Sequence, residues 1–316
     1  MAALRLAVWG ACRPRAAARS PSQAREGEYR VKIAIVTDST CDWHFEDYAA
    51  RGVTMVPLKV NFGGEESYTD QYEISCDEFY DKMIASETLP TSSQPSPHDF
   101  AQAFERLASE GYEGIVSMHI APTLSGTIQA AEIAAQTSPI PVRTFDSRGA
   151  ASLLGLLVDK ACELCETDIT LDEMCDKLNA YRDSCRIVLA PETLENLVKG
   201  GRMPAEAASQ AGMLNIRLII TLTEENGLVN VLDKVKGQKG QISAMTDYLT
   251  SYVEEHGPAR VRLLQARNQK GIDKLVDALA DAGVDYETVS VDNCGAIIAT
   301  HLGMGTLGIA MAPRDL

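Results

Sequence analysis

The sequence of 316 residues lacks the features that mark several large classes of protein. No stretch reaches the roughly 18 consecutive apolar residues that a transmembrane helix needs. The sequence contains no GxxxxGK[ST] motif, so it has no P-loop of its own, and it contains neither HExxH nor GxSxG. These absences argue against an integral membrane protein, a P-loop nucleotide enzyme, an HExxH metalloprotease and an α/β-hydrolase.

Positive charge is also scarce. Lys and Arg total 29 and Asp and Glu total 44, so the net charge is 29 − 44 = −15. Residues 1–30 hold six arginines against Glu26 and Glu28, a local +4, and the other 286 residues therefore carry −19. A body this acidic repels phosphate backbones and anionic lipid headgroups at long range. We therefore expect neither a nucleic-acid nor a membrane partner, and a small molecule or a protein partner remains.

Residues 1–30 do not resemble part of a folded domain. They contain eight alanines and six arginines, and their apolar stretch at residues 6–9 is too short for a signal peptide. Two interpretations are open: an organelle transit peptide, or a translation start placed too early, with Val31 as the true first residue. We favour the second, because VKIAIVT begins a buried strand at Val31, and leave this leader out of the fold argument.

The eight cysteines are scattered through a large chain without secretory features. This usage is typical of reduced thiols in a cytoplasmic protein. Cys162 and Cys165 form a CxxC, but the apolar run around them predicts a helix, and no second Cys or His pair lies nearby. We therefore expect ordinary thiols and neither a metal nor a cofactor.

The pattern of the first half predicts an α/β fold. Short β-branched runs alternate with helical patterns, giving strands at 31–37, 53–62, 114–120 and 142–145 and helices at 76–86, 97–110, 125–136 and 150–165. Such alternation is typical of a mainly parallel sheet that helices cover on both faces.

A second pattern begins after a helix at 171–182 and a strand at 186–190. Two strands at 216–222 and 228–234 flank the turn signal Glu225-Asn226-Gly227, which predicts a hairpin. A helix at 241–255, a strand at 260–266, a helix at 272–282 and a strand at 285–291 follow. Since this length favours two domains, we predict an N-terminal α/β domain over residues 31–185 and a mixed α/β domain over 186–316.

Three loops rich in hydroxyl groups follow or precede predicted elements of the first half: TDST at 37–40, TSSQPS at 91–96 and TLSGT at 123–127. Ligands of parallel α/β sheets bind where loops meet at the carboxyl ends of strands, and hydroxyls with helix N-terminal amides suit an anion. The alternative is that each Ser or Thr only caps its helix. Three such loops in one half favour a shared site.

The C-terminal GMGTLG fits the GxGxxG pattern of dinucleotide-binding folds. That fingerprint must open a helix and precede a strand with an acidic residue about 20 positions on, whereas the sequence ends at Leu316. We therefore reject it and expect these glycines to form a tight turn beside His301.

The order of the short motifs resembles the DegV family of fatty-acid-binding proteins. From about Val31 to the C-terminus the sequence shows TDST, VPLKV, TSSQPS, LSGT, DS, KGGR and THLGMGTLG in turn. The resemblance implies two α/β domains with a long-chain fatty acid buried between or within them. It also implies a non-catalytic role: in bacteria with a fatty acid kinase, such proteins carry the acyl chain and present its carboxylate to a separate ATP-using subunit for conversion to acyl phosphate.

The same resemblance implies the site residues. Ser92 matches the family's carboxylate-binding Thr, Ser125 the Ser of LSGT, and His301 the His of THxGPG. Arg202, in GGR, is the candidate for phosphoryl transfer or kinase contact. Since Ser93 follows Ser92 and Thr91 precedes it, the choice of hydroxyl among these three stays open.

Elementary energetics agree with a lipid carrier. A sixteen-carbon tail has about 14 methylenes, whose burial at about 0.8 kcal/mol each contributes on the order of 10 kcal/mol before ordering costs. Ser92, Ser125 and a protonated His301 would then satisfy one buried carboxylate. Two alternatives remain: a lipid carrier or sequestering protein with no kinase partner, and a hydrolase that uses Ser92 or Ser125 with His301.

Overall fold

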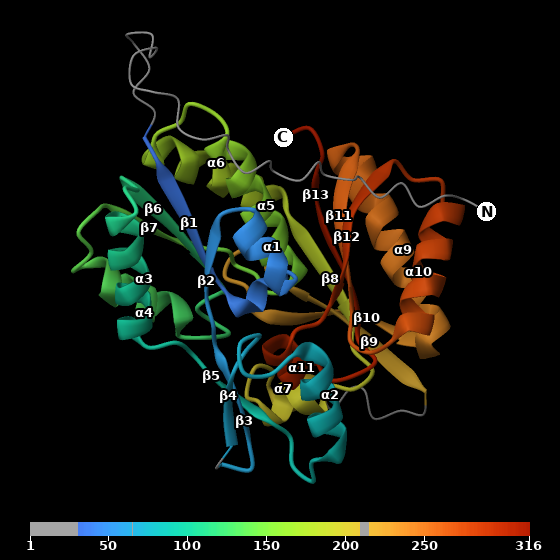
Figure 1. The fold of residues 1–316 in the computed structure, drawn as a ribbon. Coiled ribbons are helices and arrows are strands. Elements are labelled where there is room, and N and C mark those ends of the chain that lie inside the picture. The colour runs from blue at the N-terminus through green and yellow to red at the C-terminus, as the bar shows by residue number, and fades with distance from the viewer. Residues whose placement is uncertain (1–30, 65, 209–214) are drawn as a thin grey trace.

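The computed structural model describes residues 31–64, 66–208 and 215–316. The predicted leader, residues 1–30, lies outside them. Within the described residues the strands form a four-stranded, a six-stranded and a three-stranded sheet (Figure 1).

The four-stranded sheet is parallel throughout, as predicted. Its spatial order is β2 (Val53–Val56), β1 (Ile33–Asp38), β6 (Gly114–His119) and β7 (Val142–Asp146). Helices pack on both faces: α3 (Pro97–Ser109) and α4 (Thr127–Ala135) on one, α5 (Ser152–Cys165) and α6 (Leu171–Ser184) on the other. Because both faces are covered, every residue of β1 and β6 is buried.

The six-stranded sheet is mixed, as expected for the C-terminal part. Its order is β10 (Val229–Lys236), β9 (Ile216–Leu222), β8 (Arg186–Ala190), β13 (Leu307–Pro313), β11 (Ala259–Gln265) and β12 (Tyr286–Asn293). The predicted β9–β10 hairpin is present, and β11 pairs with β12 in parallel. The helices α9 (Gly237–His256) and α10 (Gln269–Asp281) cover its outer face.

The predicted strand over 53–62 is wrong as one element. It divides at Pro57 into β2, in the parallel sheet, and β3 (Lys59–Phe62), which pairs with β4 (Glu66–Thr69) and β5 (Thr91–Ser93) in the small antiparallel sheet. Proline has no N–H to donate to a ladder, so the chain changes sheets there.

The remaining helices are short, apart from α2. They are η2 (Ser39–Cys41), α1 (Phe45–Ala50), α2 (Cys76–Ala85), α7 (Glu195–Lys199), α8 (Ala205–Ala208) and α11 (Ala296–Leu302). Of these, α11 contacts β3, β5, α2 and α7, so it joins the small sheet to the segment after β8. Gly303 ends α11 with φ 76°, and Gly305 has φ 81°, which confirms the expected turn beside His301.

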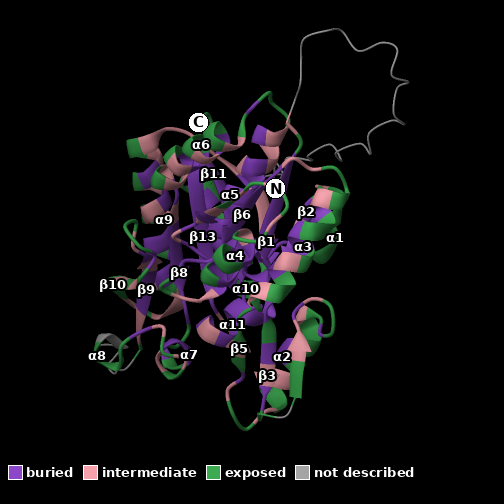
Figure 2. Ribbon diagram, turned by 90° about the vertical axis from the view of Figure 1, so that its left-hand side faces the viewer, coloured by how far each residue is buried: buried purple, intermediate pink, exposed green. Residues whose placement is uncertain are grey.

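Helix α5 is the centre of the molecule. It packs on β1 and β6 of the parallel sheet and on β11 and β13 of the mixed sheet, and most of its residues are buried (Figure 2). One hydrophobic cluster accordingly runs from Met118 through Leu154 and Leu157 to Leu264. Cys162 and Cys165 lie in this helix, as predicted.

Candidate functional site

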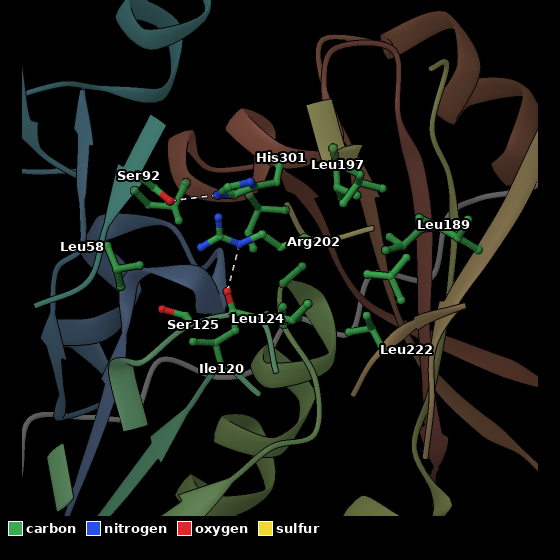
Figure 3. Close-up of a pocket in the computed structure, with 17 residues that line it drawn as sticks. Leu58, Ser92, Ile120, Leu124, Ser125, Leu189, Leu197, Arg202, Leu222 and His301 are labelled. Carbon is green, nitrogen blue, oxygen red and sulfur yellow. Dashed lines mark hydrogen bonds between the residues drawn. The ribbon is translucent and has the colours of Figure 1, made fainter. Parts of the chain in front are cut away.

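An apolar cavity opens where the carboxyl ends of the parallel strands meet α11 and the mixed sheet (Figure 3). Together with the open space at its mouth it encloses about 630 Å³. Its walls are aliphatic, and the residues that form them are Leu58, Ile120, Leu124, Ala150, Ala151, Leu189, Leu197, Ile220, Leu222, Val229, Ile297, Ile298 and Leu302.

The polar groups of the cavity gather at one end. Ser92, Ser125, Arg202 and His301 lie together there, whereas Leu189 and Leu222 lie at the other end (Figure 3). The Ser92 Oγ lies 2.8 Å from the His301 Nε2, and the Ser125 Oγ lies 2.9 Å from the Thr127 Oγ1. The cavity therefore has the polarity of an amphipathic molecule.

Arg202 supplies the positive charge of this end. It follows α7 on a turn at Gly200 and Gly201, and two backbone carbonyls hold it: its Nε donates to Leu124 O at 3.1 Å and its Nη1 to Gly200 O at 2.5 Å. No carboxylate of the described residues forms an ion pair with Arg202. Within the part of the chain that the structure describes, its charge therefore has no ion-pair partner in a largely apolar cavity.

His301 is neutral near neutral pH. Burial and, to a smaller extent, the neighbouring Arg202 guanidinium lower its pKa from 6.5 to about 4. The ring is therefore neutral in the ligand-free cavity, where Arg202 carries the positive charge among the described lining residues, and a protonated His301 beside a bound carboxylate stays a prediction. The Nδ1 of His301 is buried beside Gly200 and has no hydrogen-bond partner among the described residues.

The small sheet decides which hydroxyl of TSSQPS lines the cavity. Successive side chains of a strand point to opposite faces, so β5 directs Ser92 into the cavity and exposes Thr91 and Ser93. The Ser93 Oγ accepts a long hydrogen bond of 3.4 Å from Asn61 Nδ2, outside the cavity. Ser96 caps α3 in a capping box with Asp99, as the alternative interpretation of these loops proposed.

The structure thus brings together Ser92, Ser125, Arg202 and His301, and places Ser93 outside the group. The aliphatic walls were not singled out from the sequence. Ile297 and Ile298 stand in an apolar run, AIIAT, that resembles any other buried segment, so no local signal marked them as lining a cavity.

A buried chain of hydrogen bonds behind the site was also missed. The Asp38 Oδ2 lies 2.9 Å from His119 Nδ1, and the Ser117 Oγ lies 2.7 Å from His119 Nε2. All three side chains are fully buried. The TDST motif was noticed only for its hydroxyls, and a lone histidine in a strand gives no signal of its partners.

Among the helices of the described residues, none is both long and apolar enough to span a bilayer. Fold and site together define an α/β protein in which a parallel and a mixed sheet, joined by α5, enclose an apolar cavity with one cationic end.

The chain belongs to the DegV family. The model of that family, described as "Uncharacterised protein, DegV family", matches residues 32–314. A DegV domain-containing protein of Deinococcus radiodurans is 33% identical over 284 residues, which cover 90% of this chain and 99% of the relative.

Solved structures share the fold. A DegV family protein from Thermus thermophilus, described by its fatty acid binding, is 32% identical with a TM-score of 0.82, over 90% of this chain and all of that one. DegV from Bacillus subtilis, described as a fatty acid binding protein, is 27% identical with a TM-score of 0.80 over the same shares of the two chains.

Proposed function

We propose that this protein binds a long-chain fatty acid, with the acyl tail between the aliphatic walls and the carboxylate at Arg202. The observation that carries the proposal is a guanidinium, with no ion-pair partner among the described residues, at the polar end of an otherwise aliphatic cavity. An anion there would accept hydrogen bonds from Arg202, from the Ser125 hydroxyl and from one donor of the Ser92–His301 pair. The fatty acid binding of the Thermus and Bacillus relatives supports the proposal.

Burial of the acyl tail in the cavity would supply most of the binding free energy of such a ligand. Burial of the tail contributes on the order of 10 kcal/mol for palmitate, before the cost of ordering. The polar end then needs only to replace the hydration of one carboxylate. Affinity thus comes mainly from the tail, and the choice of headgroup comes from Arg202 and its neighbours.

The Ser92–His301 pair raises the question of a hydrolase, and two features argue against it. A catalytic base must accept a proton near neutral pH, whereas the pKa of His301 is lowered to about 4. Among residues 31–64, 66–208 and 215–316, its Nδ1 also lacks the acceptor that orients the ring in a catalytic triad. We therefore propose a non-enzymatic lipid-binding protein.

We further propose that the protein works in the cytoplasm as the substrate-carrying subunit of a fatty acid kinase. The sequence has no P-loop, so a separate ATP-dependent subunit would supply the phosphate, and Arg202 would face the developing charge. The alternative is a carrier without a kinase. Adding a candidate kinase subunit and ATP distinguishes them, because the first yields acyl phosphate, which hydroxylamine traps as the hydroxamate, and the second yields none.

Titration of the delipidated protein tests the binding proposal. Hexadecanoic acid and hexadecanol share a tail, so both fill the apolar part of the cavity. We expect the acid to bind at least about tenfold more tightly, since hydrogen bonds to charged groups contribute about 1.5–3 kcal/mol. Equal affinities, or no binding of the acid, would contradict the proposal.

A further inference from the structure

Asp38 is a fully buried carboxylate at the carboxyl end of β1, and both of its oxygens accept hydrogen bonds. Its Oδ1 accepts from the backbone N–H and the hydroxyl of Thr40, at 3.0 and 2.5 Å. Its Oδ2 accepts from the ring of His119 at 2.9 Å and from the backbone N–H of Ile120 at 3.2 Å. One side chain therefore joins the end of β1 to the end of β6.

Both arms of this junction end at the cavity. Ile120 lines the cavity and begins the loop from β6 to α4. On the other arm, the carbonyl of Thr40 accepts from the backbone N–H of Ala151 at 2.8 Å, and Ala151 also lines the cavity. Asp38 itself does not line it.

The loop that begins at Ile120 holds the cationic group. Its residue Leu124 accepts the hydrogen bond from Arg202 Nε at 3.1 Å, and the next residue is Ser125. The loop is held at other points as well: Ala121 N donates to Gly149 O at 2.9 Å, the amides of Leu124 and Ser125 donate back to Ala121 O, and Thr123 Oγ1 donates to Asn226 O at 2.9 Å. Because only three residues separate Ile120 from Leu124, a displacement of Ile120 is transmitted over a short path to the carbonyl against which Arg202 rests.

We propose that Asp38, acting through His119 and Ile120, is a positioning residue that sets the place of Arg202 and thereby the preference of the cavity for an anionic headgroup. The inference rests on the proposed fatty acid binding. It predicts a specific consequence: loss of the Asp38 junction weakens binding of the acid more than binding of the alcohol, because only the acid uses Arg202.

Two substitutions of His119 test the junction at one position. An asparagine amide nitrogen takes the place of His Nδ1, so His119→Asn keeps a donor toward Asp38. A glutamine amide nitrogen takes the place of Nε2, so His119→Gln keeps a partner for Ser117 and gives up the donor toward Asp38. Both lose the ring contact with Phe100, whose centroid lies 4.9 Å from that of His119.

The readout is the ratio of the affinities for hexadecanoic acid and hexadecanol. We expect the ratio to fall about tenfold in His119→Gln and in Asp38→Asn, the effect of one lost hydrogen bond to a charged group, and to fall less than about threefold in His119→Asn. A global loss of stability leaves the ratio unchanged, since both ligands bind the same folded state.

Asp159→Asn is the matched control. Asp159 is as buried as Asp38, but its partners Arg51 and Arg262 do not line the cavity, so this variant should keep the wild-type ratio. Wild-type ratios in Asp38→Asn and His119→Gln would overturn this inference and would leave the proposed fatty acid binding standing. If Asp38→Asn does not fold, the two His119 variants decide it. A wild-type protein without preference for the acid would overturn the proposed function and this inference with it.

Discussion

Arg202 is the residue on which the account of the headgroup depends. We expect Arg202→Gln to bind hexadecanoic acid roughly 10- to 100-fold more weakly and hexadecanol with unchanged affinity, because the carboxylate loses its charged partner. Calorimetric titration of both ligands measures this. Arg217→Gln is the control, since Arg217 pairs with Glu192 at 3.0 Å outside the cavity. Equal losses for both ligands would mean that Arg202 only supports the fold.

His301 makes the stability of the protein depend on pH in a defined direction. Its pKa is about 4 in the fold and about 6.5 in the unfolded chain, so between these values the unfolded chain binds more protons. The stabilisation by the neutral ring is complete above pH 6.5 and is lost as the pH falls toward 4. The difference between the two values corresponds to about 3 kcal/mol.

Comparison with His301→Gln isolates this effect. Other groups act in the opposite direction, such as Asp70, whose pKa burial raises to about 7. Urea unfolding of both proteins near pH 7.5 and near pH 4.5 therefore gives the relevant quantity, the free energy of unfolding of the wild type minus that of the variant. We expect it to fall by about 2–3 kcal/mol at the lower pH. A constant difference would show that His301 titrates normally.

At the scale of elements, the β9–β10 hairpin closes the cavity beside the loop that follows β6. The Thr123 Oγ1 donates to Asn226 O at 2.9 Å, and Leu222 and Val229, on either side of the hairpin turn, line the cavity. Gly227 has φ 73°, and a Cβ there would lie 2.6 Å from Ala121 Cβ and 2.8 Å from Arg148 O. The close approach of the two loops therefore requires glycine.

Gly227→Ala should lower the free energy of unfolding by more than backbone strain alone would. Gly283→Ala is the matched control, because Gly283 has φ 67° with open space around its Cα. We expect the free energy of unfolding to fall by about 1 kcal/mol in the control. In Gly227→Ala it should fall by about 1–3 kcal/mol more, because the added methyl group overpacks the contact between the loops. Urea denaturation compares them. The same loss in both variants would show that the hairpin does not rest tightly on the loop.

The sequence predicted most long elements and failed on the short ones. Hydrophobic periodicity was sufficient for the parallel sheet, the hairpin and the main helices. The three-residue β5 is too short and too polar to show a period. The central strand β13 was missed because its first residues belong to a glycine-rich motif. Both segments are strands because they pair with strands distant in sequence. β5 pairs with β3, and β13 pairs with β8 and β11.

At the scale of the whole molecule, a buried ion network ties α5 to the mixed sheet. Arg262, on β11, lies 2.6 Å from Asp159 of α5 and 3.0 Å from Asp292 of β12, and all three are almost fully buried. The guanidinium also lies over the ring of Trp43. Together with the shared hydrophobic cluster, this network predicts that the parts of residues 31–316 on either side of α5 unfold together.

Arg262→Met should lower the free energy of unfolding by about 3–5 kcal/mol, because it leaves the buried Asp292 without its cation and removes one of the two cations beside Asp159. Arg314→Met, which breaks the exposed pair with Asp285, should cost less than about 1 kcal/mol. In the wild type, Trp43 fluorescence and far-ultraviolet circular dichroism should follow one urea transition. Separate transitions would contradict a shared core.

The polar end of the site was predictable and its apolar part was not. The resemblance to the DegV family marked Ser92, Ser125, Arg202 and His301, because the ordered set of short motifs that carries it is visible in the sequence. The walls come from segments as distant as Leu58 and Leu302, which only the assembled sheets bring together. The neutral state of His301 likewise depends on burial and on Arg202, and both are properties of the folded chain.

Denaturing extraction of the purified protein, followed by mass spectrometry of the released lipid, tests the central claim most directly. The account predicts close to one long-chain fatty acid per protein chain, with much less recovered from Arg202→Gln. A wild-type protein that releases no long-chain fatty acid, and that takes up none after incubation with hexadecanoic acid, would contradict it.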